Sequence, residues 1–262
     1  ADIPHLETVL NSISGADQIN LLLHSPGGDG TIVEKMVEMC RSHLSGGQNR
    51  KFRVIVPNIA KSAATVLALG ADQILMGYCS ELGPIDPQVV VAVSGMTQSV
   101  SAFAFVEARD KLMAQIAEAI KKNEPTVGLL TQLAGLNIPF TDEMENQIGF
   151  SKKTAVTLLD KYMLKPRFPN AKQRSKSAAD IAEKLLSKQL FPVHGHYIDG
   201  GTAKKLGLEV EVIDKGDSLW NLIWDYYIRC EVQMGIPLQQ PFIKTKLFES
   251  GRGVSLVVQD TP

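Results

Sequence analysis

The chain has few of the residues that mark disulfide scaffolds and metal sites. Its 262 residues include three cysteines, Cys40, Cys79 and Cys230, which are scattered and form no CxxC pair. An odd, dispersed set argues against a disulfide framework and fits a reducing compartment. Five scattered histidines form no metal-binding constellation, and His194 and His196 lack carboxylate or cysteine partners at ligand spacing. We therefore expect no metal and no cofactor.

An excess of charge and a membrane span are missing as well. The 27 basic and 28 acidic residues leave a formal net charge of −1, which gives no electrostatic case for binding nucleic acid. No apolar run is long enough to cross a bilayer, and no signal segment begins the chain. The chain starts at Ala1 rather than Met. We expect a cytoplasmic protein, or a cytoplasmic domain associated with a membrane through an upstream segment absent from this chain.

The chain does contain 44% hydrophobic residues, enough for one large domain. Its first third alternates apolar, strand-like runs with amphipathic segments. The runs at 18–24, 52–57 and 72–77 predict strands, and the segments at 3–14 and 31–43 predict helices. Such alternation predicts an α/β fold with a mainly parallel sheet.

The middle of the chain is mostly helical. A strand is expected at 89–93, loops at 94–101 and 165–176, and helices at 102–122, 129–136, 142–164 and 177–188. A short helix at 200–205 and a strand at 208–213 follow. We expect one domain over residues 1–216, with a helical insertion at about 102–190.

The last part of the chain, residues 217–262, is expected to hold an aromatic-rich helix and a final strand-like segment, VSLVV. Its aromatic residues are Trp220, Trp224, Tyr226 and Tyr227. Because aromatic side chains are enriched at interfaces, we interpret this element as an oligomerisation surface rather than core.

A serine stands at the start of a helix made of small and apolar residues. The segment KSAATVLALG (61–70) follows the strand at 52–57 and places Ser62 in the first helical turn. The free N–H groups and dipole of a helix N-terminus stabilise an anion, such as an alkoxide or a tetrahedral oxyanion. The ordinary alternative is that Ser62 merely caps the helix.

A glycine turn ends the strand at 18–24, in the sequence HSPGGDG. Gly27 and Gly28 expose their N–H groups and let a substrate backbone come close. The glycine spacing matches neither a phosphate-binding loop nor a dinucleotide fingerprint. A serine at one strand–helix junction and a glycine turn at another are what acyl transfer requires.

Together with SELGPIDPQ (80–88), these segments resemble the fold shared by the Clp protease proteolytic subunit, signal peptide peptidase A and the crotonases. The sequence looks most similar to the serine dehydrogenase proteinase family, from about Gln18 to Gln88 and again over HGHYIDGGTAKKLGLEVEV (194–212). The resemblance implies a Clp/crotonase-like fold, built from ββα-type units with a helical insertion and a C-terminal helix. It also implies a homo-oligomeric serine peptidase acting on peptide or protein substrates.

The resemblance further implies a nucleophile and an oxyanion hole. Ser62 would be the nucleophile, and the backbone N–H groups of Ala63 and of Gly28 or Gly27 would stabilise the oxyanion. Lys61, next to the nucleophile, is expected to point away from it and to contact substrate or solvent.

The general base stays open among three residues, because no histidine follows the nucleophile helix where Clp proteases carry one. His194 ranks first and His196 second, with Asp86 or Asp199 as the orienting carboxylate. Lys111 ranks third, by analogy with the lysine base of signal peptide peptidases. In an amphipathic helix, however, Lys111 also reads as a solvated surface residue.

Two other functions remain alternatives. A crotonase-like acyl-CoA enzyme would hold a thioester enolate in the same oxyanion hole, although it would need no serine there. A catalytically silent scaffold would bind a peptide in the same groove. A serine and base within hydrogen-bonding distance would favour the peptidase, and an isolated Ser62 would favour the scaffold.

Overall fold

The computed structural model describes residues 2–13, 15–47, 50–93, 95–235, 244–249, 251 and 255–260. Strands and helices alternate through the first third, as predicted. The elements are α1 (Asp2–Ser12), β1 (Gln18–Leu22), the 3-10 turn η1 (Gly30–Ile32), α2 (Val33–Ser42), β2 (Lys51–Val56), α3 (Ala63–Leu69) and β4 (Gln73–Met76). Near the end of the chain, α8 (Gly200–Leu206) precedes β8 (Val210–Val212).

Four of these strands form the central sheet. Their order is β1-β2-β4-β8, and every neighbouring pair is parallel, which confirms the predicted α/β class with a parallel sheet. In register, Leu21 lies beside Val54, and Val54 lies beside Ile74. Strands that run in parallel need long crossover connections, and here helices supply them.

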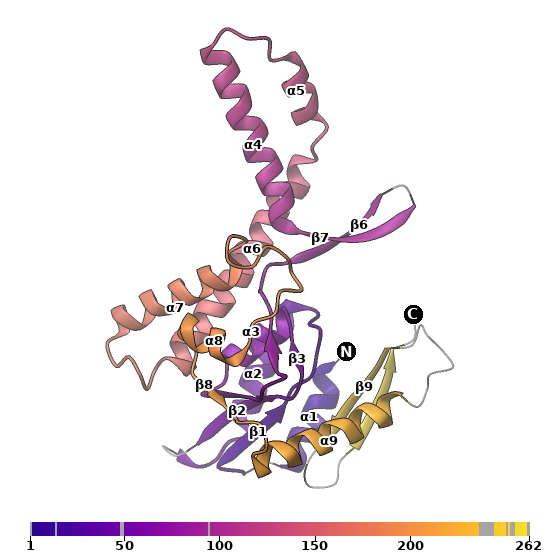
Figure 1. Ribbon diagram of the computed structural model, residues 1–262, viewed down its shortest axis with the longest axis vertical. Coiled ribbons are helices and arrows are strands. Elements are labelled where there is room, and N and C mark those ends of the chain that lie inside the picture. The colour runs from indigo at the N-terminus through magenta and orange to yellow at the C-terminus, as the bar shows by residue number, and fades with distance from the viewer. Residues whose placement is uncertain are drawn as a thin grey trace.

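The two faces of the sheet are covered by different helices. Val54, Ile74 and Met76 point into the main core, which also contains residues of α1, α2 and α3. Leu75, between Ile74 and Met76, points to the other face and packs with Trp220 of α9 (Ser218–Gly235). Because strand side chains alternate between faces, this pattern places the sheet between two helical layers (Figure 1).

The sequence analysis interpreted the aromatic residues of α9 as an oligomerisation surface, and for two of them this is wrong. Trp220 and Tyr227 are 1% and 4% exposed, so they belong to the core of the chain and not to an interface. A Cβ atom on Gly77 would lie 2.2 Å from the Trp220 indole, so this sheet face needs a glycine beneath the ring. Tyr226 is exposed on the outer side of the helix.

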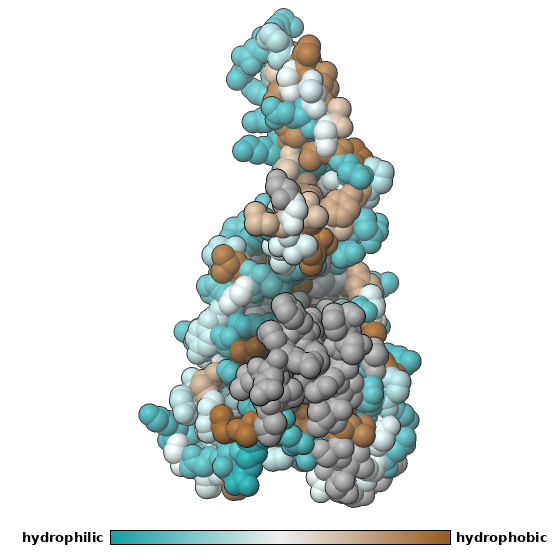
Figure 2. Space-filling view, turned by 90° about the vertical axis from the view of Figure 1, so that its right-hand side faces the viewer, coloured by the Kyte–Doolittle hydropathy of each residue, from teal (hydrophilic) through white to brown (hydrophobic). Residues whose placement is uncertain are grey.

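A hairpin and two helices project from this body (Figure 1). The hairpin pairs β6 (Gln88–Val93) with β7 (Met96–Ser101), so the loop predicted at 94–101 is wrong over most of its length. The projecting helices are α4 (Ala102–Lys121) and α5 (Val127–Ala134), and no residue of α5 is buried. Hydrophobic side chains are visible along this arm (Figure 2).

Two further helices lead from the arm back to the body. The first, α6 (Ile138–Leu158), continues into a π-helical turn, η3 (Leu159–Met163). The second, α7 (Ala171–Leu186), begins inside the loop predicted at 165–176, because the Asn170 side chain accepts a hydrogen bond from the Gln173 N–H and caps the helix. Within the described residues, no helix is long and apolar enough to span a bilayer.

The C-terminal hairpin returns to the start of the chain. It consists of β9 (Lys244–Glu249) and β10 (Ser255–Asp260), which covers the predicted final strand except Val254, a residue outside the described ones. Lys246 forms a salt bridge of 2.7 Å with Asp2 of α1.

Candidate active site

A second, very small sheet lies beside the central one and organises the candidate site. Its strands are β3 (Ile59–Ala60) and β5 (Glu81–Leu82), which pair in parallel. A parallel bridge joins Ser25 to Ala60 on one side, and an antiparallel bridge joins Leu82 to Ile198 on the other. Four distant segments are thereby brought side by side.

The directions of these segments decide which residues meet. The three parallel segments leave the small sheet at one end, so Gly27, Ser62 and Asp86 lie beyond that end, two, two and four residues after Ser25, Ala60 and Leu82. The fourth segment runs in the opposite direction. His194, four residues before Ile198, therefore lies at the same end.

Ser62 has the backbone of a strained turn. Its φ is 51° and its ψ is −120°, a backbone conformation that residues other than glycine rarely adopt. Its hydroxyl makes no capping hydrogen bond at the start of α3, so the simple N-cap interpretation is wrong. From Ala64 to Leu69 the helix is buried, whereas Ser62 is partly exposed. The Ser62 hydroxyl is thus partly exposed and makes no capping bond, at the start of a buried helix.

The glycine turn packs directly against this serine. Gly27 has a φ of +109°, and a Cβ atom there would lie 2.9 Å from both Ser62 Cβ and the Lys61 carbonyl oxygen. Its N–H donates to Ser25 Oγ at 3.1 Å, so Gly27 sets the shape of the turn and has no free donor. In the described part of the chain, the N–H groups of Gly28 and Ala63 donate no hydrogen bond.

Asp86 and His194 form a hydrogen-bonded pair. Asp86 Oδ1 lies 2.7 Å from His194 Nδ1, and Asp86 Oδ2 accepts a 2.7 Å hydrogen bond from Gln88 Nε2. Burial alone would raise the pKa of Asp86, but the hydrogen bond and charge of His194 outweigh it and lower the pKa below its usual range. Among the described contacts, no hydrogen bond joins Ser62 Oγ to His194, so the serine–base contact expected of the peptidase is not formed in this structure. The two residues do line one cavity, and in sites without substrate such hydrogen bonds are often long and shorten only when substrate binds.

The other base candidates lie elsewhere. The His196 ring packs against Phe191, with centroids 5.1 Å apart, and is not in the cavity lining. Asp199 accepts from the Thr202 N–H at 2.6 Å and so caps α8. Lys111 is exposed on the projecting helix α4 and does not line the cavity.

Lys61 points away from Ser62, as predicted, but it does not reach solvent. It is 9% exposed, and its Nζ donates to the carbonyl oxygens of Leu82 and His196, each at 3.1 Å. The same atom lies 3.1 Å from Glu81 Oε1. The expected contact with substrate or solvent is therefore wrong, because this lysine ties β3, β5 and the His194 loop together.

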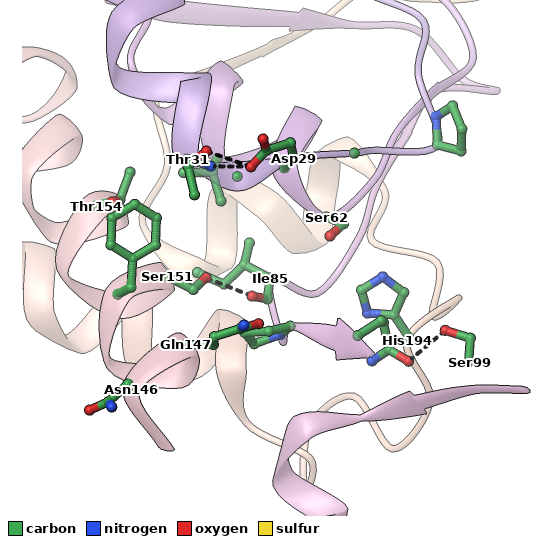
Figure 3. A pocket seen from close by; sticks show the side chains of 18 of the residues that line it. Asp29, Thr31, Ser62, Ile85, Ser99, Asn146, Gln147, Ser151, Thr154 and His194 are labelled. Carbon is green, nitrogen blue, oxygen red and sulfur yellow. Dashed lines mark hydrogen bonds between the residues drawn. The ribbon is translucent and has the colours of Figure 1, made fainter. Parts of the chain in front are cut away.

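The cavity in front of Ser62 has a volume of about 700 Å3. Ser62 and His194 lie on one side (Figure 3), and Gly28 and Ala63 are also part of the lining. Residues of α6 form the opposite wall, and the sequence analysis did not identify them: Glu143, Asn146, Gln147, Phe150, Ser151 and Thr154. Most are polar residues three or four positions apart, a helical spacing that would have marked one face of α6.

Among the described residues, no three His, Cys, Asp or Glu side chains are arranged to hold a metal ion. The fold defines the class: an α/β protein with a parallel sheet, in which Ser62 and His194 line one cavity and His194 is paired with Asp86. The chain belongs to the ClpP-like SDH-type serine proteinase family, whose model matches residues 2–133, about half of the chain. This confirms the resemblance found in the sequence. The matched region contains Ser62 and Asp86 and ends before His194.

Two uncharacterized proteins of Methanocaldococcus jannaschii are similar to parts of the chain. The protein MJ0137 is 36% identical over 86 residues, which cover 32% of this chain and 28% of the relative. The protein MJ1495 is 35% identical over 71 residues, covering 27% and 23%. The matches thus span about a quarter of each curated relative. No solved structure matches the chain.

Proposed function

We propose that this protein is a serine peptidase in which Ser62 attacks the carbonyl carbon of a peptide bond. The observation that carries the proposal is the Asp86–His194 hydrogen bond beside the cavity that Ser62 lines. A serine hydroxyl is a weak nucleophile without a base, and this pair supplies one. Membership of a serine proteinase family supports the same reaction.

In the proposed mechanism, Asp86 accepts the Nδ1–H of His194, which leaves Nε2 unprotonated and able to accept a proton. His194 takes the proton from Ser62 Oγ as the oxygen bonds to the carbonyl carbon. It then gives that proton to the leaving amine as the C–N bond breaks. A water molecule, activated by the same histidine, hydrolyses the acyl-enzyme.

The negative charge of the tetrahedral intermediate would be held by the N–H groups of Gly28 and Ala63. Both donors are unused in the described structure, and Ala63 begins a buried helix whose dipole favours an anion. Preorganised donors of this kind contribute roughly 3–4 kcal/mol each to transition-state stabilisation. We also propose that the fold that positions these two N–H groups is of the Clp/crotonase type.

We further propose that the protein works as a homo-oligomer. The support is the projecting arm, where Ile120, Val127 and Leu130 are 63%, 73% and 48% exposed. Apolar side chains on an arm with so little core of its own are stabilised when another surface covers them. Light scattering of the full chain at micromolar concentration should give a mass above 28.5 kDa. A monomer would contradict the proposal.

The peptidase is tested by two measurements on the same preparation. An alkyl fluorophosphonate should add once per chain, and peptide mapping should place the adduct on Ser62. Cleavage of unfolded casein should proceed with the wild type and stop with Ser62→Ala. A protein that neither reacts nor cleaves, while keeping its fold, would instead favour a catalytically silent scaffold.

A further inference from the structure

The lining of the cavity is one-sided in its charge. Among the described residues that line it, Asp29 and Glu143 carry carboxylates, and none is a lysine or an arginine. Neither carboxylate forms a salt bridge with a described residue. Asn146 and Gln147 add amides on the α6 wall, and Gln147 Nε2 donates a 3.3 Å hydrogen bond to Glu143 Oε1. The walls therefore offer hydrogen-bond acceptors without a permanent positive charge.

Asp29 stands next to the proposed oxyanion hole. It directly follows Gly28, whose N–H would bind the scissile carbonyl oxygen, so the Cα atoms of the two residues lie about 3.8 Å apart. Its Oδ1 accepts from the Thr31 N–H at 2.9 Å and from Thr31 Oγ1 at 2.6 Å, which fixes the carboxylate. Within the described structure Oδ2 has no hydrogen-bond partner. Figure 3 shows Asp29 and Thr31 on one wall and Gln147 of α6 on the other.

Apolar residues and a second unpaired hydroxyl, besides that of Ser62, complete the lining of the cavity. Val66 and Ile85 are 5% and 2% exposed and line it together with the Phe150 ring. Thr154 also lines it and is 2% exposed. Its hydroxyl makes no hydrogen bond to any described residue, and its oxygen is not among the fully buried atoms that lack a partner, so it is accessible from the cavity. It provides a hydrogen-bonding point inside the cavity.

We propose that this cavity binds the substrate side chain next to the scissile bond and selects chains that end in hydrogen-bond donors, lysine and arginine above all. The apolar stem of such a side chain packs against Val66, Ile85 and Phe150. Its cationic end meets Asp29, Glu143 or the Thr154 hydroxyl. A glutamate or aspartate side chain meets like charge on both walls and is rejected. The inference rests on the proposed function, because it assumes that Ser62 is the reacting atom.

The test uses matched covalent probes. Three dipeptidyl diphenyl phosphonates differ only in the side chain beside the phosphorus: lysine, its uncharged near-isostere norleucine, and glutamate. We expect the lysine probe to react about fivefold faster than the norleucine probe and the glutamate probe about tenfold slower, as for partly exposed charge pairs. Because the walls are open to solvent, raising the salt concentration from 50 to 500 mM should shrink both ratios.

Charge-removing variants assign the effect to the cavity. Asp29→Asn with Glu143→Gln should lower the lysine-to-glutamate rate ratio at least about tenfold. Glu211→Gln, at an exposed carboxylate outside the lining, makes the matched control for a loss of negative charge and should leave the ratio unchanged. Thr154→Val should slow the lysine probe more than the norleucine probe.

An alkyl fluorophosphonate, which carries no such side chain, separates the two proposals. If it labels Ser62 but the glutamate probe reacts as fast as the lysine probe, the inferred specificity is overturned and the peptidase proposal stands. An unchanged ratio in the double variant would also overturn it. If wild-type protein reacts with none of the probes, the proposed function fails and the specificity fails with it.

Discussion

Asp86 and His194 lie opposite each other across the antiparallel bridge between Leu82 and Ile198, each four residues from it. Their Oδ1 and Nδ1 atoms are 2.7 Å apart although 108 residues separate them in sequence. One short bridge thus sets the register that pairs the proposed base with its carboxylate. Lys61 Nζ donates hydrogen bonds to the carbonyl oxygens of Leu82 and His196, one on each of the two bridged segments, and so stabilises the bridge.

Comparing Asp86→Asn with Asp199→Asn should distinguish the proposed catalytic role of Asp86 from the structural role of Asp199. Asp86→Asn keeps the size of the side chain but can stabilise the wrong tautomer of His194, so we expect labelling of Ser62 to slow by about 10³–10⁴-fold. Asp199→Asn is the matched control, because Asp199 caps α8. It should cost up to about 1 kcal/mol of stability and leave the labelling rate within a few-fold. Equal losses of labelling in both variants would contradict the assigned roles.

The backbone strain at Ser62 predicts an unusually large stability advantage of glycine over alanine at this position. Ser62→Gly and Ser62→Ala both lose the hydroxyl, but only glycine adopts a φ of 51° with a ψ of −120° without a steric penalty. Glycine is already better than alanine by roughly 0.5–1 kcal/mol at an ordinary N-cap, and the strain adds to this, so we expect Ser62→Gly to be more stable than Ser62→Ala by about 2 kcal/mol or more. Urea unfolding of the two variants measures the difference. A difference no larger than that of an ordinary N-cap would show that no strain is stored there.

The contact between Gly27 and Ser62 predicts that the glycine turn tolerates no side chain. In Gly27→Ala a Cβ would lie 2.9 Å from Ser62 Cβ, at a φ of +109°. We expect a loss of about 2 kcal/mol or more, together with slower labelling as the turn moves from Ser62. Gly30→Ala, in the same loop, meets no heavy atom within 4 Å and serves as the control for stability. Similar losses in both variants would refute the close-packed turn.

His24 predicts a pH-dependent stability. Its ring packs on Tyr227 with centroids 5.1 Å apart, and its Nε2 lies 3.8 Å from Glu231 Oε1. Burial lowers the pKa of His24, and the charge of Glu231 only partly opposes this. The unfolded chain therefore takes up a proton at His24 before the folded chain does. The stability from neutral His24 is complete above pH 6.5 and is lost as the pH falls through the lower, folded-state pKa.

The check compares urea unfolding at pH 7.5 and pH 5.5. The wild type should lose more free energy of unfolding between these pH values than His24→Gln does, because glutamine does not titrate. Glu231→Gln should lose more than the wild type, since it lacks the charge that favours protonated His24. If His24→Gln shows the same pH dependence of the free energy of unfolding as the wild type, His24 is not the titrating group.

The sequence predicted the central sheet well and the small sheet not at all. Runs such as residues 52–57 carry enough alternating apolar residues to identify a buried strand. The two-residue strands β3 and β5 carry no period, so their pairing could not be foreseen. Without it, His194 could only be ranked ahead of His196, and the choice between Asp86 and Asp199 as the orienting carboxylate stayed open.

The hairpin strand β7 and the α6 wall were missed for a related reason. Residues 96–101 are mostly polar, and the first four are exposed, so they lack the buried face that makes a strand recognisable. On α6 the polar side chains that line the cavity resemble an ordinary solvated face. Only the position of α6 across from Ser62 gives them a role.

The most direct measurement compares the rate at which an alkyl fluorophosphonate labels the wild type with the rates for Ser62→Ala, His194→Ala, His196→Ala and Lys111→Ala. We predict no labelling of Ser62→Ala and a loss of at least about 10³-fold in His194→Ala. The His196 and Lys111 variants should stay close to the wild type. Labelling that survives in His194→Ala and disappears in His196→Ala or Lys111→Ala would contradict the assignment of His194 as the base.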